Sequence, residues 1–266
     1  HSFPTRRSSD LQFIYRYKNR RDWEIVGFLA SALAYGRVQQ IERSLTQLFD
    51  RMDGTPYEFT LRFDSRSRAR LRGFKHRFTT GDDISDLLTR FRRVLDESGS
   101  LEAFFLQGYR SEHATVLPAL TMFCESLTES TGGKRTSSRI DYLLASPRRG
   151  SACKRLNLFL RWMVRQDEVD VGLWKHVDKA KLIVPVDVHM GRLCRILGFH
   201  DGKSATLAAT IKITEAFAQI EPADPAKYDF ALSRIGIVEG CDGRPRPECL
   251  ACELSGICLR SPHGRK

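Results

Sequence analysis

The sequence lacks the features that would place it in a membrane or in a sheet-based fold. No uninterrupted apolar run approaches the roughly 20 residues that a membrane-spanning helix needs, so we expect no membrane partner. Alternation of β-branched and polar residues is almost absent, and there is no internal repeat or low-complexity tract. Helical patterns recur along the chain instead. The sequence therefore predicts an all-α protein, and we expect it in the cytoplasm.

Cysteine is scarce before residue 241, where only Cys124, Cys153 and Cys194 occur, far from one another. This distribution argues against a disulfide framework and favours a reducing compartment. The remaining four cysteines crowd into the last 26 residues with the spacing C-x7-C-x2-C-x5-C. Four thiolates so close together suit either a tetrahedral zinc ion or a [4Fe–4S] cluster. The candidate metal ligands are Cys241, Cys249, Cys252 and Cys258.

Acidic residues are too few to balance the basic ones. The chain has 43 Lys and Arg against 32 Asp and Glu, a net charge of +11, which favours a polyanionic partner. Residues 62–77 are strongly basic with interleaved aromatics, which predicts either a solvated flexible face or a patch that contacts phosphates. Residues 134–165 hold nine basic residues against the single acid Asp141.

The order of the helical patterns gives a predicted organisation. Residues 1–11, HSFPTRRSSDL, resemble a translated sequencing adapter and lack the apolar stretch of a signal peptide, so we expect the native N-terminus to be missing. An N-terminal helical region at 12–130 begins with a helix after Asp22 that Gly36 ends. The polar run 128–138 predicts a linker. A second helical region at 131–240 and a cysteine-containing segment at 241–266 follow.

Two residues within 147–199 are candidates for chemistry. Lys154 follows a turn formed by Pro147-Arg148-Arg149-Gly150 and begins a helical pattern. Asp187 follows Pro185, which a continuous helix does not tolerate, and precedes another helical pattern. A carboxylate at this position caps free backbone N–H groups and meets the positive end of the helix dipole. The residues alone leave Asp187 either as a helix cap or as a reactive carboxylate.

This combination resembles the helix-hairpin-helix DNA glycosylases that carry an iron–sulfur cluster, the endonuclease III and MutY group. In that family a V-D-x-H-V-type segment presents the essential aspartate, which matches Asp187 here. The family cysteine pattern, C-x6-C-x2-C-x5-C, differs by one residue in its first spacing. Its hairpin, close to L-P-G-V-G-x-K, is degenerate here, and only Pro147, Gly150 and a displaced Lys154 correspond to it.

The chain also resembles a bacterial family of unknown function that is related to this group. The shared segments are KRLNLFLRWMVR, a V-D-x-G-L-W stretch at 169–174 and P-x-D-x-H at 185–189. This second resemblance covers most of residues 20 to 240.

The resemblance implies two helical subdomains with a DNA-binding cleft between them. It implies base-excision N-glycosylase activity on a damaged base in duplex DNA, with or without abasic-site lyase activity, by a monomer that acts at the nucleoid. Asp187 would lie beneath the sugar and would either stabilise its developing positive charge or activate the nucleophile. Lys154 would be the nucleophile of a lyase. A [4Fe–4S] cluster would stabilise the C-terminal segment. The expected DNA-contacting residues are Tyr35, Arg37, Arg148, Arg149, Gly150, Arg155, Arg161, Arg244 and Arg246.

Two other functions remain open from the sequence. One is a DNA-binding protein of the same fold without catalysis, which the degenerate hairpin favours. The other is a zinc-stabilised protein that binds another nucleic acid. Asp187 at the family position favours the enzyme over the DNA-binding protein without catalysis.

Overall fold

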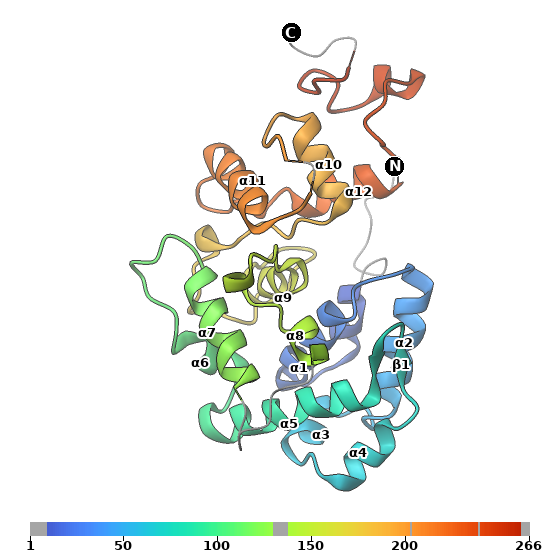
Figure 1. Cartoon of the computed structure of the whole chain (residues 1–266), viewed down its shortest axis with the longest axis vertical. Helices are drawn as coiled ribbons and strands as arrows, with labels where there is room; N and C mark the ends of the chain where they lie inside the picture. Colours follow the sequence, from blue (N-terminus) through green and yellow to red (C-terminus); the bar gives the residue numbers. More distant parts are fainter. Residues whose placement is uncertain (1–9, 130–137, 203, 239, 262–266) are drawn as a thin grey trace.

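The computed structural model describes residues 10–129, 138–202, 204–238 and 240–261, and this part of the chain is mostly helical (Figure 1). The expected all-α character is confirmed at this level. The exception within the described residues is a short hairpin, β1 (Lys75–His76) with β2 (Thr79–Thr80). Residues 1–9 and 130–137, which hold most of the predicted adapter segment and of the predicted linker, lie outside the described residues. No helix in the described part is long and apolar enough to cross a membrane.

The larger part of the molecule is built from the elements before residue 183. They are η2 (Asp10–Arg16), α1 (Arg20–Ala32), α2 (Val38–Asp50), α3 (Pro56–Leu61), α4 (Ser65–Leu71), α5 (Gly81–Ser98), α6 (Leu101–Leu106), α7 (Leu117–Thr128), α8 (Ser138–Leu143), η3 (Pro147–Arg149), α9 (Lys154–Val164) and η4 (Lys179–Lys181). The smaller part contains α10 (Val188–Ile196), α11 (Leu207–Ile220), α12 (Asp229–Val238) and η5 (Pro247–Ala251).

Helix α1 is the central helix of the larger part. Its start is capped by the Asn19 side chain, which accepts a hydrogen bond from the Arg21 N–H at 3.1 Å. The Phe28 ring contacts Phe91 of α5, Phe123 of α7 and Phe159 of α9. The buried carboxylate of Glu24 accepts hydrogen bonds from the first amides of α6 and from the Trp174 indole. One helix thus fixes the position of α9, whose first residue is Lys154.

Two hydrophobic clusters divide the described chain between residues 183 and 184. The first extends from Leu11 to Ile183 with Ala226 added, and the second is centred on Val184, Val186, Met190 and Cys194. In Figure 1 the second cluster, with α10, α11 and α12, lies at one end of the molecule. Helices α8 and α9 therefore pack with the N-terminal elements, although the sequence pattern grouped them with the later ones.

A buried network of ions joins the two clusters. Arg161 of α9 pairs with Asp170 at 3.1 Å and with Asp229 of α12 at 2.7 Å. Arg165 pairs with Asp170 and also with Asp224, at 2.8 Å. Asp224 and Asp229 flank the start of α12, so the network ties the smaller part to α9. Each charge has a partner here, as buried charges require.

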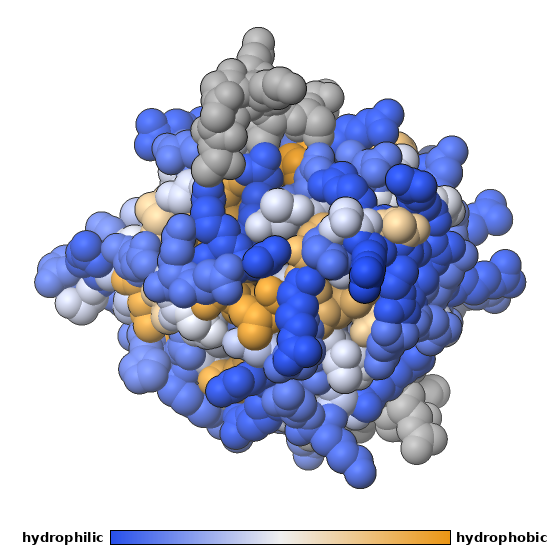
Figure 2. All heavy atoms as spheres, turned by 90° about the horizontal axis from the view of Figure 1, so that it is seen from below, coloured by the Kyte–Doolittle hydropathy of each residue, from blue (hydrophilic) through white to orange (hydrophobic). Residues whose placement is uncertain are grey.

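The basic run at 62–77 is partly paired with acidic residues in the structure. Arg68 pairs with Asp86 at 2.7 Å, Arg70 pairs with Asp53, and Arg62 lies 3.4 Å from Glu58. The run forms α4 and the first strand of the hairpin, with Asp64 capping the helix. The sequence left open whether this run is a flexible solvated face or a patch that contacts phosphates. In the structure it is an ordered surface on which some of the arginines are paired with acidic residues. The face seen in Figure 2 is mostly hydrophilic, with a group of hydrophobic residues near its centre.

Candidate active site

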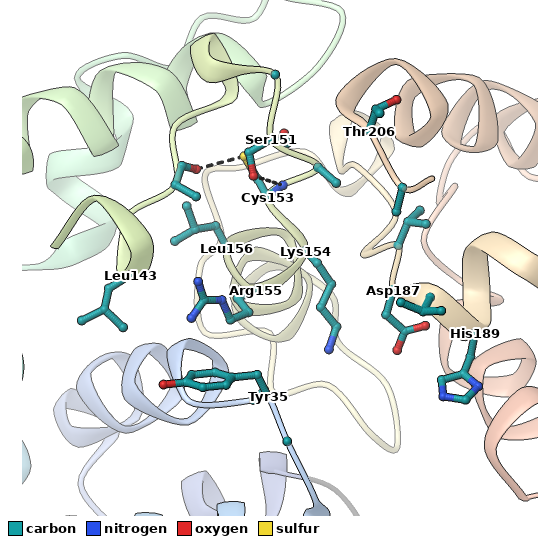
Figure 3. Close-up of a pocket in the computed structure, with 18 residues that line it drawn as sticks. Tyr35, Leu143, Ser151, Cys153, Lys154, Arg155, Leu156, Asp187, His189 and Thr206 are labelled. Atoms are coloured by element: carbon teal, nitrogen blue, oxygen red, sulfur yellow. Dashed lines mark hydrogen bonds between the residues drawn. The ribbon is translucent and has the colours of Figure 1, made fainter. Parts of the chain in front are cut away.

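A pocket of about 660 Å³ lies where the two parts of the molecule meet (Figure 3). The end of α1 and the connection from α8 to α9 form one side of it. The starts of α10 and α11 form the other side, and a backbone hydrogen bond from the Leu207 N–H to the Gly150 carbonyl joins the two sides at 3.2 Å. Both residues that the sequence selected for chemistry, Lys154 and Asp187, line this pocket.

Lys154 is the first residue of α9 and is half-buried. Within the described residues its ammonium group makes no hydrogen bond or ion pair, and its side chain extends into the same space as the carboxylate of Asp187 (Figure 3). Its charge acts on two buried carboxylates. Burial raises the pKa of Asp10 to about 6, and Lys154 opposes that rise. Burial also raises the pKa of Asp229, and the negative charge of Asp187 raises it further. The positive charges of Arg161 and Lys154 lower it.

Asp187 caps α10, as the sequence predicted. Its Oδ1 accepts a hydrogen bond from the Met190 N–H at 2.8 Å, and its backbone is extended, at φ −100° and ψ −174°. The cap uses one carboxylate oxygen. The second oxygen has no hydrogen-bond partner among the described residues, and the carboxylate faces the pocket (Figure 3). Capping and a reaction at the pocket are therefore compatible in one residue.

Three helix N-termini converge on the pocket, those of α9, α10 and α11. Asp187 caps α10 and the Thr206 hydroxyl caps α11, but α9 has no side-chain cap. Uncapped amides and aligned helix dipoles favour an anion in front of them. The pocket thus combines a carboxylate, an amine and a positive backbone field.

The predicted hairpin forms a turn whose amides are already used. The Gly150 N–H donates to the Pro147 carbonyl at 2.9 Å, and the Arg149 N–H donates to the Ser146 carbonyl at 3.1 Å. The Gly150 amide is therefore already bonded within the turn, and the DNA contact expected at Gly150 stays a prediction. Gly150 also serves the turn through its φ of +74°, which side-chain-bearing residues rarely adopt.

The side chains of Arg148 and Arg149 remain at the surface beside this turn. Arg148 pairs with Glu125 and is 73% exposed, and Arg149 pairs with Asp141 and is 63% exposed. Both can exchange these partners for phosphates at little cost, because exposed ion pairs contribute only about 0–1 kcal/mol.

Two other predicted DNA contacts are engaged by groups of the protein itself, Arg161 in the interior and Arg155 at the pocket wall. Arg161 is 2% exposed and forms the ion network with Asp170 and Asp229, so its assignment to a phosphate is wrong. Arg155 donates to the carbonyl oxygens of Ala32 and Tyr142, and burial lowers its pKa. Its guanidinium lies 4.1 Å from the Tyr142 ring centroid. Arg155 thus positions the end of α1 and the pocket wall.

An aromatic group flanks the pocket, and the sequence identified only one member of it. Tyr35 stacks on Phe78 with ring centroids 5.2 Å apart, and Tyr142 packs edge-on against both rings. The Tyr35 hydroxyl lies 2.7 Å from the Thr79 hydroxyl and also donates to the His76 carbonyl. Phe78 is 53% exposed at the turn of the β1–β2 hairpin. Arg37 lies nearby in sequence and is exposed at the start of α2.

His189 and Cys153 also line the pocket and were not assigned from the sequence. The Nδ1 of His189 accepts from Arg192 at 3.2 Å. The Cys153 thiol donates to the Ala145 carbonyl at 3.0 Å, and burial raises its pKa to about 11. A buried thiol held in its protonated form is a poor nucleophile, so Cys153 is not a candidate for the reactive group.

The four C-terminal cysteines lie in a segment that docks on α10. The Leu259 N–H donates to the Ile196 carbonyl at 3.1 Å, and Leu254 packs against the second cluster. All four thiols are free and half-buried, a donor set whose chemistry suits iron–sulfur or zinc. Among the described residues, however, no three such ligands are grouped around a common point. The cofactor therefore stays a prediction that rests on the chemistry of these four thiols.

The loop between the first two of these cysteines carries Arg244 and Arg246. Arg244 is 88% exposed and lies 3.8 Å from Asp242. Arg246 is less exposed and donates to the Gly240 carbonyl at 3.3 Å. Neither lines the pocket, so any DNA contact they make lies away from Lys154 and Asp187.

Comparison with known proteins gave one match. The comparisons with curated proteins and with solved structures found no match. The profile of the family described as "Protein of unknown function (DUF2400)" matches residues 10–238, which include every element from η2 to α12 and the whole pocket. The chain belongs to this DUF2400 family.

Proposed function

We propose that this protein is a DNA N-glycosylase of base-excision repair, with Asp187 and Lys154 as its reactive groups. The observation that carries the proposal is that a half-buried lysine and a carboxylate share one pocket, and that the amine and one carboxylate oxygen have no partner in the described part of the chain. Three helix N-termini around that pocket favour the phosphates that flank a nucleotide. The net charge of +11 supports a duplex DNA partner.

The chemistry follows from the two groups. Cleavage of the glycosidic bond develops positive charge on the sugar, which the Asp187 carboxylate stabilises. In the lyase route Asp187 accepts a proton from Lys154, and the amine attacks C1′ as the bond to the base breaks. The base leaves with the electron pair and takes a proton from water. The sugar ring then opens to a Schiff base on Lys154, and loss of a C2′ proton expels the 3′ phosphate.

The target nucleotide has to leave the stack before it enters the pocket, at a cost of a few kcal/mol. We propose that Phe78 fills the gap that the nucleotide leaves in the DNA stack. Phe78 is exposed at the hairpin turn, and its ring stacks on Tyr35. Phe78→Ala should reduce, several-fold, the fluorescence rise of 2-aminopurine placed opposite or beside the lesion. An equal change in Phe230→Ala, a residue of α12, would refute this assignment.

The experiment that tests the function is a panel of lesion-containing duplexes with borohydride trapping. Wild type should release at least one damaged base and become covalently trapped on that duplex, whereas Lys154→Ala should not be trapped. Lys175→Ala is the matched control, because Lys175 donates to Gln166 outside the pocket. Excision without trapping would make the enzyme monofunctional, with Asp187 activating water. Absence of excision on every lesion would contradict the proposal.

A DNA-binding protein without catalysis is the second candidate. The observation that favours it is the hydrogen bond from the Met190 N–H to Asp187, because the cap alone is a sufficient structural reason for an aspartate here. Duplex binding without release of any base would favour this function. For either function we propose a monomer that acts on chromosomal DNA in the cytoplasm.

A further inference from the structure

A second, smaller pocket of about 320 Å³ adjoins the first and shares Asp187, Val188 and Ala205 with it. Its other walls come from α10 and from the loop between α10 and α11. Asp187 is the one residue in the lining of this pocket that the sequence analysis selected. Whatever occupies it lies directly beside the carboxylate that we propose stabilises the positive charge on the sugar.

Two arginines of α10, Arg192 and Arg195, line this pocket. They are three positions apart on the helix and therefore lie on the same face. In the described residues neither forms an ion pair with an acid. Arg192 donates to His189 at 3.2 Å, and Arg195 donates to the Gly202 carbonyl at 3.4 Å, which leaves most of the N–H groups of both free.

The third polar group is His200, which is 8% exposed and lines the same pocket. Its Nε2–H donates to the Gly191 carbonyl at 2.8 Å, because a carbonyl can only accept. Its Nδ1 is buried and has no partner among the described residues. Buried polar atoms are normally hydrogen-bonded, so the unpartnered Nδ1 of a residue that lines a pocket points to a ligand there. Asp201, the next residue, pairs with Lys212 at 3.7 Å.

We propose that this pocket binds one backbone phosphate of the nucleotide whose sugar faces Asp187. Two guanidinium groups that form no ion pair among the described residues match the oxygens of a phosphate, and the His200 ring forms part of the wall of the same pocket. Two cationic groups outweigh the single charge of Asp187 on the shared wall. The inference rests on the proposed function, and it makes the substrate a nucleotide within a strand rather than a free base.

The first test uses inorganic phosphate and full-length protein. Phosphate should raise the Tm of wild type above its value in chloride at equal ionic strength, because a ligand of the folded state stabilises it. The doubly substituted Arg192→Gln/Arg195→Gln protein should lose this increment. Arg62→Gln/Arg66→Gln, with the same charge change at the C-cap of α3 and in α4, should keep it. Absence of the increment in wild type, or its persistence without Arg192 and Arg195, would overturn the proposal.

The second test distinguishes a backbone phosphate from a free one. The probe is a duplex with a tetrahydrofuran abasic analogue and a single uncharged methylphosphonate 5′ or 3′ of it. One of the two methylphosphonates should weaken wild-type binding about tenfold and leave binding by Arg192→Gln/Arg195→Gln unchanged. Equal effects on both proteins would overturn the backbone assignment. A phosphate-dependent Tm with no excision of any lesion would refute the glycosylase while leaving the site in place.

Discussion

At the scale of single residues, Asp187 combines a structural and a proposed chemical role, and one substitution separates them. Asn retains a carbonyl oxygen that can accept from the Met190 N–H, so Asp187→Asn should keep the cap of α10. It removes the negative charge that we assign to the sugar. We therefore expect excision to fall by about 100- to 1,000-fold, as for loss of one electrostatic contact to a transition state, while Tm changes little.

The measurement for Asp187→Asn is single-turnover base release alongside thermal unfolding. Asp96→Asn is the matched control, since Asp96 is exposed on α5 and lies 3.7 Å from Arg92. It should alter neither quantity. Unchanged excision by Asp187→Asn would leave Asp187 as a helix cap alone.

At the scale of elements, α9 connects the two hydrophobic clusters through buried charges. Asp170 is 1% exposed and accepts from both Arg161 and Arg165. Asp170→Asn leaves those arginines short of one counter-charge in the interior. We expect the free energy of unfolding to fall by about 3–5 kcal/mol, the usual cost of breaking a buried ion pair.

Denaturant unfolding of Asp170→Asn checks this expectation. Glu58→Gln removes the partner of Arg62 at the surface and should change stability by no more than about 1 kcal/mol. If the two variants lose the same stability, the buried network is not what joins α9 to the smaller part.

The cysteine segment is the other element with a sharp prediction. If a [4Fe–4S] cluster gathers the four thiols, anaerobically purified protein should contain about four irons per chain and absorb near 400 nm. The Cys252→Ser protein should lose most of the iron and have a lower Tm. The Cys124→Ser protein, which lacks a buried thiol of α7, should retain the iron. Stoichiometric zinc without iron would replace the cluster with a structural zinc site.

At the scale of the whole molecule, the sequence predicts helices better than it predicts their neighbours. The apolar spacing and capping residues locate α1 and α10, because these signals are local. The strands of the β1–β2 hairpin are too short to show alternation, so Phe78 could not be placed beside Tyr35. Arg161 looked available to DNA because its partner Asp229 lies far away in the chain.

The pocket itself shows the same division between local and distant information. Each of Lys154 and Asp187 follows a helix-breaking segment, which the sequence displays. That the two share one pocket depends on the packing of α9 against α1 and on the strand-like bridge between Ser151 and Thr206. No spacing rule encodes that packing. The family resemblance, rather than periodicity, is what related the two residues.

The last prediction concerns the charge of the molecule as a whole. A protein that neutralises several phosphates releases counterions, so duplex affinity should fall steeply as salt rises. Arg148→Gln/Arg149→Gln should weaken binding to all sequences alike and reduce the slope of log affinity against log salt by about 2, roughly one per lost phosphate contact. Glutamine is preferable to glutamate here, because a new acid would lie beside Glu125 and Asp141.

Arg62→Gln/Arg66→Gln removes the same charge from the C-cap of α3 and from α4, which lie at the opposite end of the molecule from α10 in Figure 1. It should change the slope by clearly less. Equal slopes for the two double variants would mean that net charge, and not the turn before Lys154, governs binding. If wild type binds no duplex even at low salt, the glycosylase and the DNA-binding protein fail together, because both require the turn and the three helix N-termini to meet phosphates.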